Sequence, residues 1–168
     1  MLNLERDLAR WDGKSADDIR CVYDRHHDES SFSDSLISLL GSSEFAVGAS
    51  WLLKHYFEHG GAADKEQSHS ICKALRNLSH WAASLHVLQC LPYLIITPQD
   101  RQVLELFVRE GLGDRNKFVR AWSYNGLYEL SKRFPDLRDE TRIIFEMALR
   151  DEAPSVKARI RQLIKKGV

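Results

Sequence analysis

Four side chains of the kinds that bind transition metals fall close together in the sequence. His55 and His59 lie one helical turn apart, and His69 and Cys72 follow three residues apart beyond Gly60-Gly61. If the two segments are antiparallel helices, imidazoles and a thiol could meet and hold zinc. Structural zinc sites usually contain close pairs of cysteines, which this sequence lacks, and helices often carry partly buried histidines. We expect no metal or other cofactor, and the convergence of these four residues stays open.

No other part of the sequence has a pattern typical of a catalytic centre. Gly111-Leu112-Gly113 is half of a nucleotide-loop pattern, but no third glycine follows, so we expect a turn there. There is no Gly-x-Ser-x-Gly motif and no phosphate-binding loop with Lys-Ser or Lys-Thr. Adjacent carboxylates such as Asp17 and Asp18 point in different directions on a helix, so they do not form a catalytic acid–base pair. The sequence predicts a protein that is not an enzyme.

The elements that position these residues are predicted to be all helical. Apolar residues recur three and four positions apart, and no segment alternates convincingly as a strand. Helix start signals occur at residues 15–18, 64–67 and 97–100. We expect helices over residues 3–10, 15–26, 33–40, 44–59, 65–77, 79–91, 98–110, 116–133, 136–150 and 154–166. Trp11, Trp51, Trp81 and Trp122 are expected to pack in the core.

The predicted helices form pairs, and the pairs repeat. Aligning the starts of the second helices makes Phe45, Trp81, Val119 and Val156 equivalent, at separations of 36, 38 and 37 residues. A period of this size with two helices per unit is typical of a helical solenoid, whose stacked units supply the core. A helical bundle is the alternative, because amphipathic helices resemble one another loosely. Proline and glycine in register with the period favour the solenoid.

Residues 97–168 resemble HEAT repeats of the bacterial kind, and residues 32–94 resemble them less closely. In that family a Val-Arg pair opens the second helix, spaced leucines fill the core, and proline or aspartate marks the unit boundary. The resemblance rests on residues 116–120, Leu127, Leu130, residues 133–137 and residues 151–157. It implies a right-handed α-α superhelix of about four helix pairs over residues 32–168. Residues 1–31 would form an N-terminal helical cap, and residues 1–168 a single domain.

The resemblance also implies that the second helices line a concave, partner-binding side. On the predicted 116–133 helix, four side chains lie outside the core face and form a stripe toward solvent: Lys117, Arg120, Tyr124 and Tyr128. Shifting these positions forward by one repeat gives Lys157, Arg161 and Lys165. Shifting them backward gives His86 and then Ser50. Such a basic and aromatic groove fits an elongated anionic partner. Alternatively, Arg120 pairs with Asp114 or another acidic neighbour, and both tyrosines pack beneath the next unit.

Composition and charge restrict the partner. The 168 residues are 43% hydrophobic and 29% charged, which is typical of a folded globular chain. Residues 1–70 carry 7 Lys and Arg against 13 Asp and Glu, whereas residues 71–168 carry 17 against 11. The pI near 7.1 is low for a dedicated nucleic-acid binder. For the basic half we expect a protein partner with an acidic segment, and nucleic acid is the alternative.

The resemblance implies a non-catalytic binding module, because small bacterial HEAT-like proteins serve as subunits of complexes or as toxin-immunity proteins. The nucleic-acid alternative is a relative of the DNA alkylation-repair glycosylases, which share helical repeats, although no motif beyond the repeats matches. The most apolar stretch, Val87 to Ile96, is too short for a membrane helix, and the first residues are no signal peptide. Three scattered cysteines, Cys21, Cys72 and Cys90, fit reduced thiols. We expect a cytoplasmic protein with no membrane partner.

Overall fold

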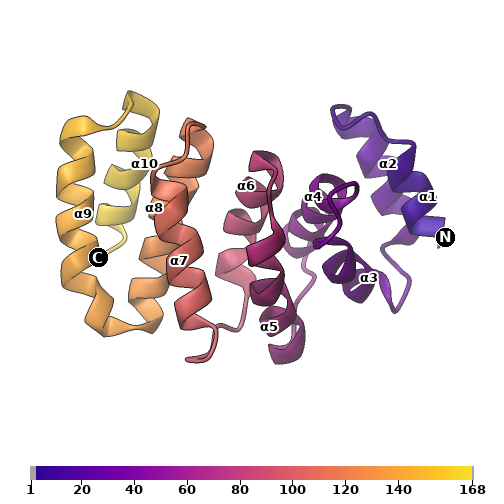
Figure 1. Ribbon diagram of the computed structural model, residues 1–168, viewed down its shortest axis with the longest axis horizontal. Helices are drawn as coiled ribbons and strands as arrows, with labels where there is room; N and C mark the ends of the chain where they lie inside the picture. Colours follow the sequence, from indigo (N-terminus) through magenta and orange to yellow (C-terminus); the bar gives the residue numbers. More distant parts are fainter. Residues whose placement is uncertain (1–2, 168) are drawn as a thin grey trace. The chain divides into compact units, whose positions relative to one another are not determined.

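The computed structural model describes residues 3–167, and within them it contains ten α-helices and no strand (Figure 1). Each expected helix is present, with bounds that differ by a few residues from the prediction. The helices are α1 (Asn3–Ala9), α2 (Ala16–His26), α3 (Phe32–Leu39), α4 (Ala46–Glu58), α5 (Lys65–Ala74), α6 (Trp81–Cys90), α7 (Arg101–Leu112), α8 (Lys117–Arg133), α9 (Arg138–Asp151) and α10 (Pro154–Lys165). There are also three short 3-10 turns. η1 (Leu75–Asn77) follows α5, η2 (Leu91–Tyr93) follows α6, and η3 (Pro135–Leu137) precedes α9.

The chain divides into two compact units, one ending at Ile95 and the other starting at Ile96. In the N-terminal unit, α4 is the central helix and packs against α2, α3 and α6, while α3 also contacts α5. The fully buried apolar side chains of this unit come from several of these helices, and they include Ile19, Leu36, Leu52, Leu53, Ile71 and Leu88. Removing this apolar surface from water is the main source of stability for such a unit.

In the C-terminal unit, α8 is the central helix and contacts α7, α9 and α10. Its buried core includes Leu104, Val108, Val119, Leu130, Phe145 and Ile160. Polar pairs reinforce the contact between the outer helices, because Arg109 of α7 donates to both carboxylate oxygens of Glu140 in α9 at 2.9 and 2.8 Å. A bidentate pair of this kind fixes the relative position of two helices more strictly than a single contact does.

Two of the three predicted helix start signals are confirmed. The Ser15 hydroxyl accepts a hydrogen bond from the Asp18 backbone N–H at 3.1 Å, and Asp64 and Gln67 form a reciprocal capping box. The third prediction is wrong, because α7 begins at Arg101 rather than at residue 98. The Asp100 carboxylate accepts from the backbone N–H and the hydroxyl of Thr97, at 3.1 and 2.6 Å, and closes a turn before the helix.

The turn predicted at Gly111-Leu112-Gly113 starts later than expected, since α7 continues through Leu112 and Gly113 caps it. Gly111 instead permits a close approach between helices. A Cβ built on Gly111 would overlap the hydroxyl of Ser123 in α8 and would lie 3.3 Å from the Ser123 Cβ. This glycine is therefore required by the packing of α7 on α8.

One of the four tryptophans expected in the core is exposed. Trp81 is 47% exposed at the first position of α6, where it stacks on His80. The other three tryptophans are half-buried. Spacing along a helix predicts which residues share a face, but it does not predict how far that face is covered at the end of the helix.

Candidate functional site

The seven residues predicted to form a basic and aromatic stripe lie on α8 and α10, both in the C-terminal unit. The structure separates them into three groups. Lys117, Arg161 and Lys165 are exposed, Arg120 and Lys157 are half-buried and hydrogen-bonded, and Tyr124 and Tyr128 are buried. The stripe is therefore not a continuous surface along α8.

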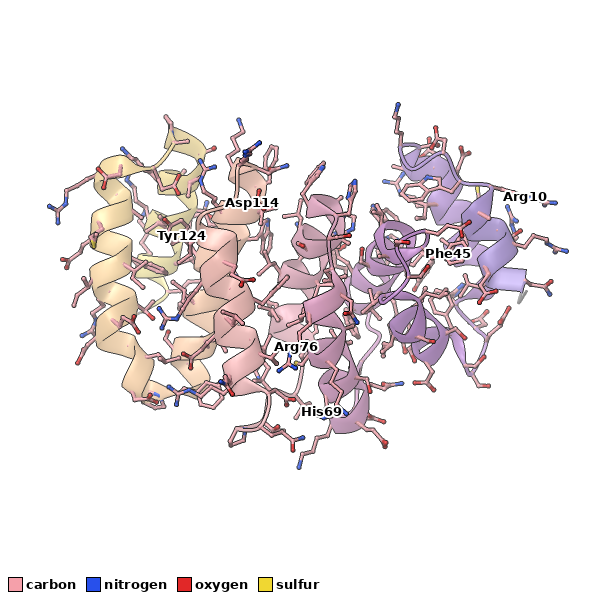
Figure 2. All side chains as sticks on the ribbon, in the orientation of Figure 1. Arg10, Phe45, His69, Arg76, Asp114 and Tyr124 are labelled. Carbon is pink, nitrogen blue, oxygen red and sulfur yellow. The ribbon has the colours of Figure 1, made fainter. Side chains whose placement is uncertain are left out.

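Arg120 belongs to a hydrogen-bond network that joins α8 to the α9–α10 connection. Its Nε donates to both carboxylate oxygens of Glu152, at 3.0 and 3.1 Å, and its Nη1 donates to the backbone carbonyls of Asp114 and Arg115, at 2.9 and 3.2 Å. Asp114 lies in the turn between α7 and α8 (Figure 2). Arg120 thus pairs with an acidic neighbour, which was the alternative to a free binding residue, and that neighbour is Glu152 rather than the Asp114 carboxylate.

The Glu152 carboxylate is mostly buried, and it is held in its charged form. Burial alone would raise the pKa of Glu152, but the hydrogen bonds from Arg120 and from the backbone N–H of Ala153 outweigh burial and lower it. The Tyr124 hydroxyl also donates to Glu152, at 3.2 Å. Burial and the nearby Glu152 charge raise the pKa of Tyr124 to about 12, so this phenol stays protonated.

The prediction that the two tyrosines face solvent is wrong. Tyr124 is 6% exposed and meets Phe145 of α9 edge to face, with ring centroids 6.0 Å apart. Tyr128 is 8% exposed, and the Lys132 ammonium lies 5.1 Å from the centre of its ring. α8 contacts α7, α9 and α10, so it buries more than one side of its surface. Neither tyrosine offers a free ring for stacking.

Three cations of the predicted stripe lie on one side of α10, which we call the basic face. The basic face consists of Lys157, Arg161, Ile164 and Lys165, which share one side of the helix at spacings of three and four. Lys157 donates to the Arg150 carbonyl at 2.8 Å, while Arg161 and Lys165 form no ion pair with any residue that the structure describes. α10 carries no Asp or Glu, and the large apolar side chain on this face is the exposed Ile164.

A second contact on α10 was not predicted. The Arg159 guanidinium lies 4.0 Å from the centre of the Trp122 ring on α8, and its Nη1 donates to Asn125 at 3.4 Å. Trp122 and Arg159 are 37 residues apart, so they hold equivalent positions in the repeat proposed from the sequence. That offset was the signal that could have predicted their contact.

The same relation occurs in the N-terminal unit between Ser50 of α4 and His86 of α6, the two positions that the repeat offset made equivalent. The Ser50 hydroxyl lies 3.1 Å from Nδ1 of His86. Burial, together with the positive charge of Lys54, lowers the pKa of His86 to about 4. His86 is therefore a neutral packing residue at physiological pH.

The structure brings together two of the four candidate metal ligands. His55 and His59 have ring centroids 3.9 Å apart, and His55 also stacks on Trp51 and meets the edge of Tyr23. Burial and the His59 ring lower the pKa of His55. Among residues 3–167 no group of three or more His, Cys, Asp or Glu side chains could hold a metal ion, so His69 and Cys72 do not join this pair.

Comparisons with known proteins add no relative. No family model, no curated protein and no solved structure matches the chain. In the described part of the chain, no helix is both long enough and apolar enough to cross a membrane.

Proposed function

We propose that this chain is a non-catalytic, cytoplasmic protein-binding module built from HEAT-like helix pairs over residues 32–168, capped by residues 1–31. Two contacts support the repeat assignment. Ser50 touches His86, and Trp122 touches Arg159, so equivalent positions meet where α4 packs on α6 and where α8 packs on α10. Contacts between equivalent positions of successive second helices are what stacking of repeated units requires.

The binding partner that we propose is a protein segment that is acidic and partly apolar, and its site is the basic face of α10. One observation carries this proposal. Arg161 and Lys165, which form no ion pair with the described residues, lie beside the exposed apolar side chain of Ile164 on a helix that has no carboxylate. Carboxylates of the partner would pair with the two cations, and its apolar residues would cover Ile164.

Nucleic acid is the less well supported partner. Proteins that bind single strands combine cations with exposed aromatic rings on which bases stack. Tyr124 and Tyr128, the rings that the sequence pattern offered for this purpose, are buried. Because neither tyrosine offers a stacking surface beside the cations of α10, we favour a partner with carboxylates over nucleic acid. Apolar contacts with Ile164 would add to the attraction.

The proposal is tested with a labelled peptide as long as α10, 12 residues, with leucines at helical spacing among glutamates. Binding to the whole chain is followed by fluorescence anisotropy. The double variant Arg161→Glu with Lys165→Glu should weaken binding roughly tenfold, which corresponds to about 1.4 kcal/mol. Lys73→Glu with Arg76→Glu makes the same charge change at exposed positions of the N-terminal unit and should change affinity little.

A single-stranded oligonucleotide with the same number of charges distinguishes the two partner classes. The proposal predicts weaker binding of the oligonucleotide than of the peptide. Tighter oligonucleotide binding that falls steeply with salt would replace the proposal with its nucleic-acid alternative. Equal peptide affinity for the two double variants would show that the basic face of α10 is not the site.

A further inference from the structure

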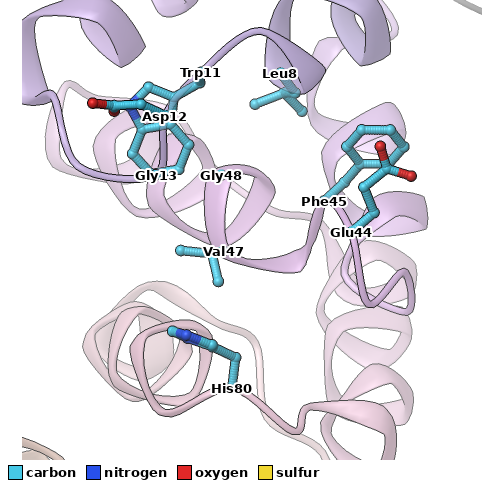
Figure 3. Close-up of a pocket in the computed structure, with 9 residues that line it drawn as sticks. All are labelled: Leu8, Trp11, Asp12, Gly13, Glu44, Phe45, Val47, Gly48 and His80. Atoms are coloured by element: carbon cyan, nitrogen blue, oxygen red, sulfur yellow. The ribbon is translucent and has the colours of Figure 1, made fainter.

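A hollow of about 270 Å3 lies in the N-terminal unit, and none of its lining residues belongs to the basic face (Figure 3). The α1–α2 connection, the start of α4 and the residue before α6 enclose it. The lining residues are Leu8, Trp11, Asp12, Gly13, Glu44, Phe45, Val47, Gly48 and His80. Apolar and aromatic side chains thus meet two carboxylates, and among residues 3–167 no lysine or arginine lines the hollow.

The aromatic wall of this hollow is held in place. A Cβ built on Gly48 would lie 2.7 Å from Cδ2 of Leu8 and 3.3 Å from the Trp11 ring, so the glycine lets both side chains lie close against α4. The indole N–H of Trp11 donates to the Ser15 carbonyl at 2.8 Å. The ring therefore keeps one orientation, and a ligand that stacks on it loses little entropy in ordering the wall.

The carboxylates are available for a ligand. Oδ1 of Asp12 accepts from the backbone N–H groups of Ser15 and Lys14, both at 2.8 Å, and these bonds lower the pKa of Asp12. Its other oxygen accepts no hydrogen bond from the described residues. Glu44 is exposed and forms no ion pair within residues 3–167. Nδ1 of His80 accepts from the Ala82 N–H at 3.2 Å, so a neutral ring would carry its proton on Nε2.

We propose that this hollow receives an arginine side chain from a basic segment of a partner protein. A guanidinium stacks with its plane on an aromatic ring and is attracted by carboxylates. The Trp11 ring offers the stacking surface, while Asp12 and Glu44, on opposite sides of the hollow, supply the negative charge (Figure 3). Anionic ligands are repelled by the two carboxylates. The site has the opposite charge preference to the basic face of α10, so either proposal can fail while the other stands.

The test uses a blocked peptide with one arginine between glycines and the same peptide with citrulline, which is uncharged and nearly isosteric. Binding is followed by the NMR signal of the Trp11 indole N–H, assigned with the variant Trp11→Phe. The arginine peptide should shift this signal saturably, and the citrulline peptide should need roughly tenfold more ligand. A signal that does not move, or that moves equally with both peptides, overturns the proposal.

Variants show whether the lining carboxylates carry the effect. Glu44→Gln and Asp12→Asn each remove one charge, and asparagine keeps an oxygen for the N–H groups of Lys14 and Ser15. Each should weaken arginine-peptide binding several-fold, with citrulline-peptide binding unchanged. Glu66→Gln removes an exposed carboxylate of the same unit outside the hollow and should have no effect. If Glu66→Gln weakens binding as much as Glu44→Gln does, the attraction belongs to the acidic unit as a whole and not to this hollow.

Discussion

Arg120 and Arg161 both lie on second helices of the proposed repeat, but their replacement should affect stability differently. Arg120→Glu would place a carboxylate beside the mostly buried Glu152 and remove the hydrogen bonds to it. We expect the free energy of unfolding to fall by about 2–3 kcal/mol. Arg161→Glu changes an exposed, unpaired residue and should stay within about 0.5 kcal/mol. Denaturant unfolding of both variants measures the difference, and equal effects would contradict the assigned network.

The environment of His26 predicts how the free energy of unfolding depends on pH. Its buried ring lies 2.7 Å from a Glu29 oxygen and 3.0 Å from an Asp7 oxygen. Burial alone would lower the pKa of His26, but these two carboxylates outweigh burial and raise it above 6.5. The stabilisation that protonated His26 gives the folded chain is therefore fully present below pH 6.5. It is lost as the pH rises through the raised pKa of His26.

The expected result is a free energy of unfolding that decreases as the pH rises above 6.5 in the unmodified chain. His26→Gln should remove this part of the decrease. The lowered pKa values of His55 and His86 keep both rings neutral over this range, so they do not mask the effect. Parallel pH profiles for the two proteins would show that His26 is not the source.

Among the elements, the contact of α7 with α8 depends on one glycine. Gly111→Ala should lower the free energy of unfolding by about 1–3 kcal/mol, because the new methyl group overlaps the buried Ser123 hydroxyl. Removing that hydroxyl with Ser123→Ala should restore much of the loss, since alanine also favours the helix over glycine. A double-mutant cycle by chemical denaturation measures this coupling. Additive effects would mean that the overlap is relieved in another way.

The helices themselves could be predicted from the sequence, whereas the coverage of their faces could not. Spacing of apolar residues and capping signals at Ser15 and Asp64 are local, and they predicted where the helices lie. The burial of Tyr124 and Tyr128 depends on how α8 packs against its neighbouring helices, and the spacing within α8 carries no information about that. Asp100 similarly moved the start of α7 through a bond to Thr97 that competes with helix initiation.

At the scale of the whole molecule, the two proposed sites follow the charge of the segments that carry them. Residues 1–70 are acidic and contain the two carboxylates of the hollow, while residues 71–168 are basic and contain the face on α10. The sequence predicted this division of charge. It could not predict the hollow, because Trp11, Glu44 and His80 are far apart in the chain and are brought together by folding.

The opposite charges predict a common response to salt. Exposed charge pairs are screened over distances of about 10 Å at 0.1 M ionic strength. Raising the salt concentration should therefore weaken binding of the acidic peptide to the basic face and of the arginine peptide to the hollow. Isothermal titration at low and high salt measures both affinities. An affinity that does not depend on salt would show that apolar contacts alone hold that peptide.

Mapping where the acidic peptide binds shows whether α10 presents the partner-binding surface. Backbone amide signals of the full chain are recorded by NMR during titration with the glutamate–leucine peptide. If α10 is the site, the largest shifts of the amide signals fall on residues 157–166 and saturate together, while the signals of α3 and α5 stay in place. Shifts centred on any other helix, or no saturable shifts at all, would contradict it.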